Sequence, residues 1–220
     1  MKASDLFVKC LEAEGVTKIF GIPGEENADL MISLKKSKIE FVLCRHEQAA
    51  AFMADVYGRL TGKAGVCLAT LGPGVTNLMT GLADANMDRA PVVAIIGQGS
   101  TERLHKESHQ IMDSISMVAP ISKWAQTILS AKNVTEVVRK AFKVAETEKP
   151  GVTVIELPED VAKEEVNENP IKPSLIRRPA ADYRAVNEAI ELIISAKNPI
   201  ILAGNAVSYT HLRAHETSID

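Results

Sequence analysis

Short apolar runs that alternate with helical patterns constrain the fold of this chain more than any other feature. Each run is a few residues long, is rich in Val and Ile, and ends in Gly, Pro or a polar residue. Such runs are typical of strands that are buried on both faces of a parallel sheet. We expect strands in "KIFGI", "EFVLC", "GVCLAT", "PVVAIIG" and "GVTVIEL", with "SKWAQTIL" as a further candidate.

Helical patterns lie between these runs. A first helix is expected over residues 4–14, with Ser4 as its N-cap and Gly15 as its C-terminal stop. Further helices are expected near residues 26–36, 47–61, 74–87 and 134–147. Strands that alternate with helices form parallel sheets with right-handed crossovers, so the pattern predicts an α/β fold.

Prolines within a polar, charged stretch indicate where the first domain ends. They stand at positions 158, 170, 173 and 179, where they interrupt both helices and strand ladders. We expect a first domain over residues 1–162, a linker over 163–181 and the start of a second α/β domain over 182–206. Residues 207–220 break the alternation and are interpreted as a disordered or non-native tail, in which His211 and His215 carry no functional inference.

Charge and composition exclude several classes of function. The net charge is −3 with acidic and basic residues interspersed, so the chain lacks the basic surface that nucleic acid or an anionic membrane requires. No apolar run reaches the ~18 residues of a membrane helix, and the N-terminus is an amphipathic helix rather than a signal peptide. We therefore expect a soluble, cytoplasmic protein without a nucleic-acid or membrane partner.

The three cysteines predict buried thiols rather than a metal site. Cys10, Cys44 and Cys67 lie inside apolar runs, without a CxxC motif and without a histidine at metal-binding spacing. We therefore expect free thiols in the core and no metal ligands among these residues.

A Gly-Pro-Gly turn, "LGPGVTN", follows the expected strand at 65–70. It lies where a phosphate or nucleotide could meet a helix N-terminus. The dinucleotide motif G-x-G-x-x-G/A is absent because its third glycine position is Asn77, and no P-loop motif occurs. Pro73 is suited to the first helical position, and Gly74 permits close approach of another group to the backbone. The pattern fits either a simple strand-to-helix turn or a ligand site.

Glu47 also has two interpretations. An acid in the first turn of a helix is stabilised by the helix dipole and needs no further purpose. Alternatively, the small apolar residues around it, "CRHEQAAAFMA", would desolvate the carboxylate and allow it to share a proton with a heterocyclic nitrogen. The spacing alone leaves both open.

Four segments together resemble a known family. They are "FGIPGEEN", "RHEQAAAFMADVYGRLTGKAGVCLATLGPGVTN", "DRAPVVAIIGQ" and "KPGVTVIELPEDV". In this order and spacing they resemble the pyrimidine-binding domain of thiamine-diphosphate-dependent enzymes, specifically the acetolactate (acetohydroxyacid) synthase large-subunit family, over about residues 1–206. The resemblance implies a flavodoxin-like doubly wound parallel sheet.

The resemblance also implies roles for individual residues. Glu47 would hydrogen-bond N1′ of the aminopyrimidine ring, and Gln110 would face the reacting end of the cofactor. These two are the expected catalytic residues. The expected cofactor-binding residues are Glu47 together with Pro23, Gly24, Thr70, Pro73 and Asn77.

For the whole protein, the resemblance implies condensation of two pyruvates to 2-acetolactate with release of CO₂. Mg²⁺ and the diphosphate would be held by a C-terminal domain that this chain lacks, and a homodimer or homotetramer would form through the pyrimidine-binding domain. His109 and Gln110 resemble the His-Gln pair of flavin-free catabolic synthases, whereas biosynthetic members usually carry Phe-Gln; FAD dependence stays open. The alternatives are another thiamine-diphosphate-dependent decarboxylase or carboligase for 2-oxo acids, and a non-catalytic α/β ligand-binding module.

Overall fold

The structure is a computed structural model that describes residues 1–174, 181–200 and 202. Contacts divide the chain into two units, residues 1–176 and 177–220. In the second unit, α8 (Tyr183–Ser195) is capped by Asp182, whose carboxylate accepts hydrogen bonds from the amides of Arg184 and Ala185. Residues 201 and 203–206 of the expected second domain, and the two C-terminal histidines, lie outside the described residues.

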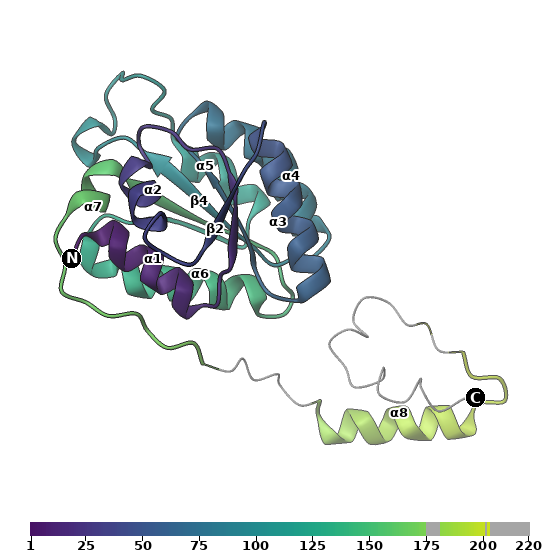
Figure 1. Cartoon of the computed structure of the whole chain (residues 1–220). Coiled ribbons are helices and arrows are strands. Elements are labelled where there is room, and N and C mark those ends of the chain that lie inside the picture. Colours follow the sequence, from purple (N-terminus) through teal and green to yellow (C-terminus); the bar gives the residue numbers. More distant parts are fainter. Residues whose placement is uncertain (175–180, 201, 203–220) are drawn as a thin grey trace. The chain divides into compact units, whose positions relative to one another are not determined.

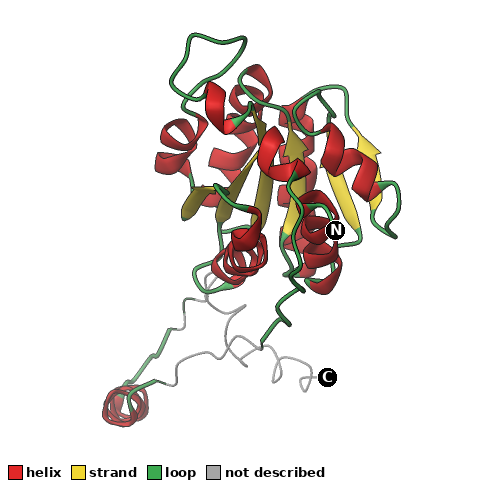
Figure 2. Cartoon of the chain, turned by 90° about the vertical axis from the view of Figure 1, so that its left-hand side faces the viewer, coloured by secondary structure: helices red, strands yellow, loops and turns green. Residues whose placement is uncertain are grey.

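A single parallel sheet forms the centre of the first unit (Figures 1 and 2). Its strand order is β2-β1-β3-β4-β6-β5, and neighbouring strands of this sheet pair in parallel. The strands are β1 (Lys18–Gly21), β2 (Glu40–Leu43), β3 (Gly65–Ala69), β4 (Val92–Gln98), β5 (Trp124–Thr127) and β6 (Val152–Pro158). All six lie in the expected segments, and the α/β prediction is confirmed.

Helices cover both faces of this sheet, as a doubly wound fold requires. One apolar cluster packs α1 and α6 against the sheet, and a second packs α3 and α4 against the opposite face. The helices of this unit are α1 (Ala3–Ala13), α2 (Ala28–Leu34), α3 (Glu47–Thr61), α4 (Pro73–Met87), α5 (Ser114–Val118), α6 (Val134–Glu146) and α7 (Glu159–Lys163), with short 3₁₀ turns at Thr101–Arg103, Ala119–Ile121 and Ala131–Asn133.

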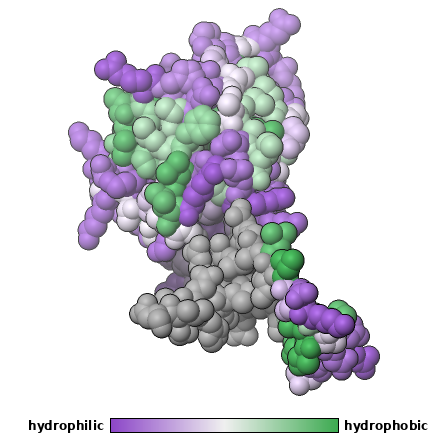
Figure 3. All heavy atoms as spheres, turned by 90° about the vertical axis from the view of Figure 1, so that its right-hand side faces the viewer, coloured by the Kyte–Doolittle hydropathy of each residue, from purple (hydrophilic) through white to green (hydrophobic). Residues whose placement is uncertain are grey.

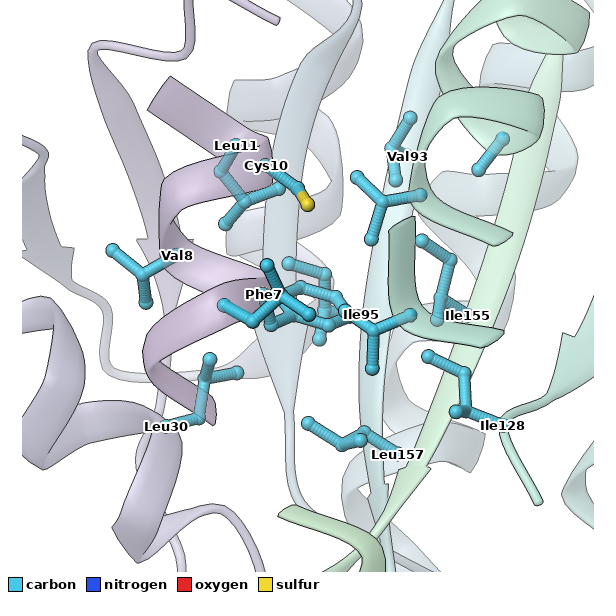
Figure 4. Close-up of a cluster of buried hydrophobic side chains, with 14 of the residues drawn as sticks. Phe7, Val8, Cys10, Leu11, Leu30, Val93, Ile95, Ile128, Ile155 and Leu157 are labelled. Carbon is cyan, nitrogen blue, oxygen red and sulfur yellow. The ribbon is translucent and has the colours of Figure 1, made fainter. Parts of the chain in front are cut away.

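The first cluster shows why these residues form these elements. Phe7 and Leu11 stand one helical turn apart on α1 and are fully buried. Figure 4 shows Phe7 pointing toward Ile95 of β4, and Leu11 and Ile155 of β6 belong to the same buried cluster. Burying one such side chain contributes roughly 1.5–3 kcal/mol, so the apolar face of α1 fixes the helix on the sheet.

Strands β3, β4 and β6 are buried along their whole length, as expected. By contrast, β2 and β5 are only partly buried, because they form the two edges of the sheet. None of the helices in the described ranges is long and apolar enough to cross a bilayer.

The expected N-cap at Ser4 is wrong. Helix α1 begins at Ala3, and Lys2 occupies the cap position. The amide of Ala3 donates a hydrogen bond to the carbonyl of Glu164, 2.8 Å away, so a backbone group takes over the role of a cap side chain. Ser4 is instead buried, with its hydroxyl 3.0 Å from that of Ser33 on α2. The stop at Gly15, with a φ of 81°, is confirmed.

The burial of the three cysteine thiols is also confirmed. Removal from water raises the pKa of Cys10 and of Cys67 to about 12. Burial likewise raises the pKa of Cys44. Burial therefore disfavours the reactive thiolate form of all three cysteines in the folded chain.

Candidate active site

The expected site residues follow β1, β2, β3 and β4, at the carboxyl edge of the sheet, and all of them except Pro23 have contacts there with other residues of the site. Ligands of open parallel sheets bind at this edge. Glu47 begins α3, directly after β2, and Gly72 connects β3 to α4 with a φ of 53°. Pro73 is the first residue of α4, as expected.

Glu47 is buried although it begins a helix. Its exposed fraction is 9%. The cap of α3 is supplied by His46, whose Nδ1 accepts a hydrogen bond from the amide of Gln48 at 3.1 Å. A dipole interaction requires only that the acid be near the helix end, and an exposed acid would satisfy it. The burial of Glu47 is therefore not explained by helix stabilisation alone.

Asn77 holds one oxygen of the Glu47 carboxylate. Its Nδ2 donates a hydrogen bond of 2.9 Å to Glu47 Oε2. In the part of the chain that the structure describes, Oε1 receives no hydrogen bond of its own. A Cβ added to Gly74 would lie 3.6 Å from this Oε1. The absence of a side chain at Gly74 therefore leaves space for one more atom in van der Waals contact with Oε1, and Asn77 fixes the orientation of the carboxylate.

The loop after β1 packs tightly against the end of β3. A Cβ added to Gly24 would lie 2.5 Å from Cβ of Thr70, so only glycine fits at that position. The Thr70 hydroxyl donates a 2.7 Å hydrogen bond to Glu26. The methyl group of Thr70 would lie 3.2 Å from a Cβ on Gly74. Thr70 thus connects the β1 loop to the Glu47 carboxylate region, and Glu26 is a partner that sequence reasoning missed.

Gln110 lies in the segment that follows β4, near the start of α4. Its backbone is left-handed, with a φ of 56°. Its carbonyl oxygen would lie 2.5 Å from a Cβ on Gly72, and its own Cβ would lie at 3.1 Å. The structure therefore brings Gln110 to the turn that carries Pro73, although its side chain and that of His109 are exposed. Pro23 is also exposed, and no contact places it against the other site residues.

A second polar cluster lies beside this edge and was not expected from the sequence. Gln98, Thr127 and Glu156 line a cavity of about 440 Å³ together with residues of the 104–115 segment. Burial raises the pKa of the Glu156 carboxyl, against the lowering effect of its hydrogen bonds with Thr127 and Gln98. The sequence signal was available, because Glu156 interrupts the apolar run "GVTVIEL". Over the described ranges, no group of three or more His, Cys, Asp or Glu side chains could hold a metal ion.

Comparison with known proteins agrees with this geometry. Residues 1–117 match the family model described as "Thiamine pyrophosphate enzyme, N-terminal TPP binding domain". The chain belongs to this thiamine pyrophosphate (thiamine diphosphate) enzyme family. The parallel sheet with helices on both faces is consistent with the fold of this N-terminal cofactor-binding domain.

Individual relatives show which enzymes of this family the chain is similar to. The chain is 42% identical over 204 residues to a catabolic acetolactate synthase of Raoultella terrigena, covering 91% of this chain and 36% of that protein. It is 40% identical over 218 residues to a probable acetolactate synthase large subunit of Methanococcus aeolicus, covering 94% and 36%. It is also 37% identical over 211 residues to a glyoxylate carboligase of Escherichia coli O157:H7, covering 94% and 36%. The chain thus spans about a third of the length of the curated relatives it matches.

Proposed function

We propose that this chain is the N-terminal, pyrimidine-binding part of a thiamine-diphosphate-dependent acetolactate synthase. The observation that carries the proposal is the buried Glu47 carboxylate, whose Oε2 accepts a hydrogen bond from Asn77 and whose Oε1 lies beside Gly74 without a hydrogen bond from the described residues. The printed names of the relatives from Raoultella terrigena and Methanococcus aeolicus support acetolactate synthesis, the condensation of two pyruvates with release of CO₂. The glyoxylate carboligase relative supports a second candidate, carboligation of another 2-oxo acid.

The residues of this chain would bind and orient the cofactor. Thiamine diphosphate, when bound, supplies the nucleophilic carbon that attacks a 2-oxo acid. Glu47 Oε1 would share a proton with a ring nitrogen, while the bond from Asn77 keeps the carboxylate from rotating away. Gly24 and Gly74 would let a flat ring approach the backbone, and the lining would be completed by Pro23, Thr70 and Pro73.

Other parts of the parent protein would complete the site. Mg²⁺ and the diphosphate need hard oxygen ligands, and the described residues offer no such cluster. We therefore assign these groups to a further domain and expect no acetolactate from the 220-residue chain alone. Gln110 would face the substrate side of the cofactor. The proposed substrate is a small 2-oxo acid. The proposed location of the protein is the cytoplasm.

An apolar surface on α3 supports assembly into a homodimer or homotetramer. Met53, Val56 and Leu60 follow one another at helical spacing and are 44%, 50% and 82% exposed. Figure 3 shows the side of the molecule that carries α3 and α4, where apolar residues gather between polar ones. Exposed apolar patches of this kind mark protein–protein contacts. We propose that a second copy of the chain covers the α3 face.

Glu47→Gln in the full-length parent tests the cofactor assignment. Gln keeps the size and the contact with Asn77 but removes the acid. Exchange of the C2 hydrogen of bound thiamine diphosphate for deuterium, followed by NMR, should slow by about 10²–10⁴-fold. In urea melts of the 220-residue chain the variant should be as stable as the wild type or more so, because a buried charge has been removed.

Glu136→Gln is the matched control. Glu136 is also an acid in the first turn of a helix, α6, but it is exposed. Its replacement should cost roughly 0.3–1 kcal/mol of stability through the helix dipole and leave C2 exchange unchanged. Wild-type exchange in Glu47→Gln would refute the cofactor assignment.

A further inference from the structure

Gln98 and Glu156 form a buried pair at the ends of neighbouring strands. Ile96 of β4 stands in register with Glu156 of β6, so Gln98 lies two residues beyond that level. Gln98 is 2% exposed and Glu156 is 4% exposed. Gln98 Nε2 donates to Glu156 Oε1 at 2.9 Å. An ionisable acid that is 4% exposed requires a reason, since burial of an acid is costly.

Each polar atom of the Gln98 side chain is used. Besides Glu156, Nε2 donates to the carbonyl of Met112 at 3.1 Å, and Oε1 accepts from the amide of Gly99 at 3.0 Å. Thr127 of the neighbouring strand β5 donates to the second oxygen of Glu156 at 2.6 Å. The Gln98 amide is therefore held in one orientation by Glu156 and by the Gly99 amide. Its Nε2 also donates a hydrogen bond to the segment that follows β4.

Other contacts of that segment are few: Ile111 lies against Gly99, and the Ser108 hydroxyl accepts two hydrogen bonds from Arg103. A cavity of about 440 Å³ is lined by Leu104, Ile111 and Met112 of the segment and by Gln126, Thr127 and Glu156 of the strands. A continuous apolar core therefore does not fill the space at this point. The bond from Gln98 to Met112 crosses from the sheet to the segment two residues after Gln110.

We propose that Gln98, oriented by Glu156, is a positioning residue that tethers the 108–112 segment and thereby sets the place of Gln110 at the active site. Glu156 acts through Gln98 and touches neither cofactor nor substrate. The close approach of Gln110 to Gly72 also restricts where this segment can lie. The part of this proposal that concerns catalysis rests on the function proposed above for Gln110.

Gln98→Met tests the tether in the 220-residue chain. Methionine keeps the length of the side chain but removes both donors. Hydrogen–deuterium exchange of the amides of residues 108–112, followed by mass spectrometry, should speed up by about 10-fold, the equivalent of one or two hydrogen bonds. The amides of β3 in the same sample report whether the whole domain has loosened, and their exchange should change by less than about 2-fold.

Two control variants separate the tether from burial of polar groups in general. Thr127→Val removes the other hydrogen bond to Glu156 but keeps the bond from Gln98 to Met112. Glu156→Gln keeps an oxygen that accepts from Gln98. Both should leave exchange of residues 108–112 within about 2-fold of the wild type. Unchanged exchange in Gln98→Met, or equal acceleration in Thr127→Val, would overturn the tether.

The catalytic consequence is measured in the full-length parent. Gln98→Met should lower kcat/KM for pyruvate by about 10-fold while the Kd for thiamine diphosphate stays within about 2-fold, and its effect should not add to that of Gln110→Ala. Accelerated exchange with unchanged kcat/KM would overturn the positioning role and the role of Gln110. The Glu47→Gln experiment would still decide the cofactor assignment separately.

Discussion

Replacement of Arg59 tests how ion pairs between α3 and α4 stabilise the edge of the domain where Glu47 and Asn77 lie. Arg59 on α3 makes a two-point contact with Asp55, Nε to Oδ1 and Nη2 to Oδ2, each 2.8 Å long. The same guanidinium contacts Asp84 at 3.1 Å and Asp88 at 2.6 Å, both at the end of α4. Asp55 is 2% exposed. Arg59 therefore neutralises a buried acid and joins the two helices that carry Glu47 and Asn77.

The magnitude follows from burial. Removing one partner of a fully buried ion pair costs about 3–5 kcal/mol. The side chain of Arg59 is 39% exposed, so water reaches the pair and the expected cost falls to about 2–3 kcal/mol. Arg59→Met, which keeps the alkyl stem, should lower the free energy of unfolding of the 220-residue chain by that amount in urea melts at pH 7. Two further variants provide the comparison.

Asp84→Asn removes only an exposed partner, with 48% of its side chain accessible, and should cost less than about 1 kcal/mol. Asp55→Asn combined with Arg59→Met removes the charge that Arg59→Met leaves unpaired. The double variant should therefore recover at least about 1 kcal/mol relative to the sum of the single variants. A cost for Arg59→Met no larger than that of Asp84→Asn would refute the argument from burial.

Three further predictions concern the edge of the sheet and the α3 face. Because burial raises the pKa of Glu156 above its ordinary value of 4.5, the folded chain binds this proton more tightly than the unfolded chain, and stability falls as pH rises above 4.5; Glu156→Gln should be more stable than the wild type at pH 8 and equal to it at pH 4 in urea melts. Gly74→Ala should weaken thiamine diphosphate binding to the full-length parent by about 10-fold or more, measured by calorimetry, because its methyl group would occupy the space beside Glu47 Oε1, 3.6 Å away; unfolding of the 220-residue chain should shift by less than about 1 kcal/mol, since alanine favours the helix, and unchanged affinity would contradict the site. Leu60→Glu should shift sedimentation toward the monomer while changing the free energy of unfolding by less than about 0.5 kcal/mol; unchanged sedimentation of a self-associating chain would exclude the α3 face.

Local patterns in the sequence were sufficient to predict the strands and helices, and to predict at which edge of the sheet the site forms. Apolar runs that end in Gly or Pro predicted the strands, and parallel strands collect their carboxyl ends at one edge. That geometry explains why Glu47 and Asn77, thirty residues apart in the chain, meet in the structure. The open choice between helix stabilisation and a buried acid could not be decided from sequence, because burial depends on packing by distant elements.

The features that the sequence did not predict correctly, or did not predict at all, share a physical cause. Ser4 is a good cap by residue type, yet the carbonyl of Glu164, far away in sequence, satisfies the amide at the helix start instead. The placement of β6 between β4 and β5 and the bond from Gln98 to Met112 are likewise non-local. Residue type and spacing carry no information about such pairings, whereas a buried acid within an apolar run does indicate that a polar partner exists.

The position of β6 has a consequence for synthesis of the protein on the ribosome. The strand that lies between β4 and β5 is the last to be made, so β5 has no partner in the sheet until residue 158 has left the exit tunnel. The backbone hydrogen bonds of the N-terminus also form late, because Met1 and Ala3 bond to Val166 and Glu164. At about 5–20 residues per second the half-finished sheet presents the unpaired side of β4 to the cell for several seconds. Chaperone capture of nascent chains should therefore peak between the completion of β4 and the emergence of β6.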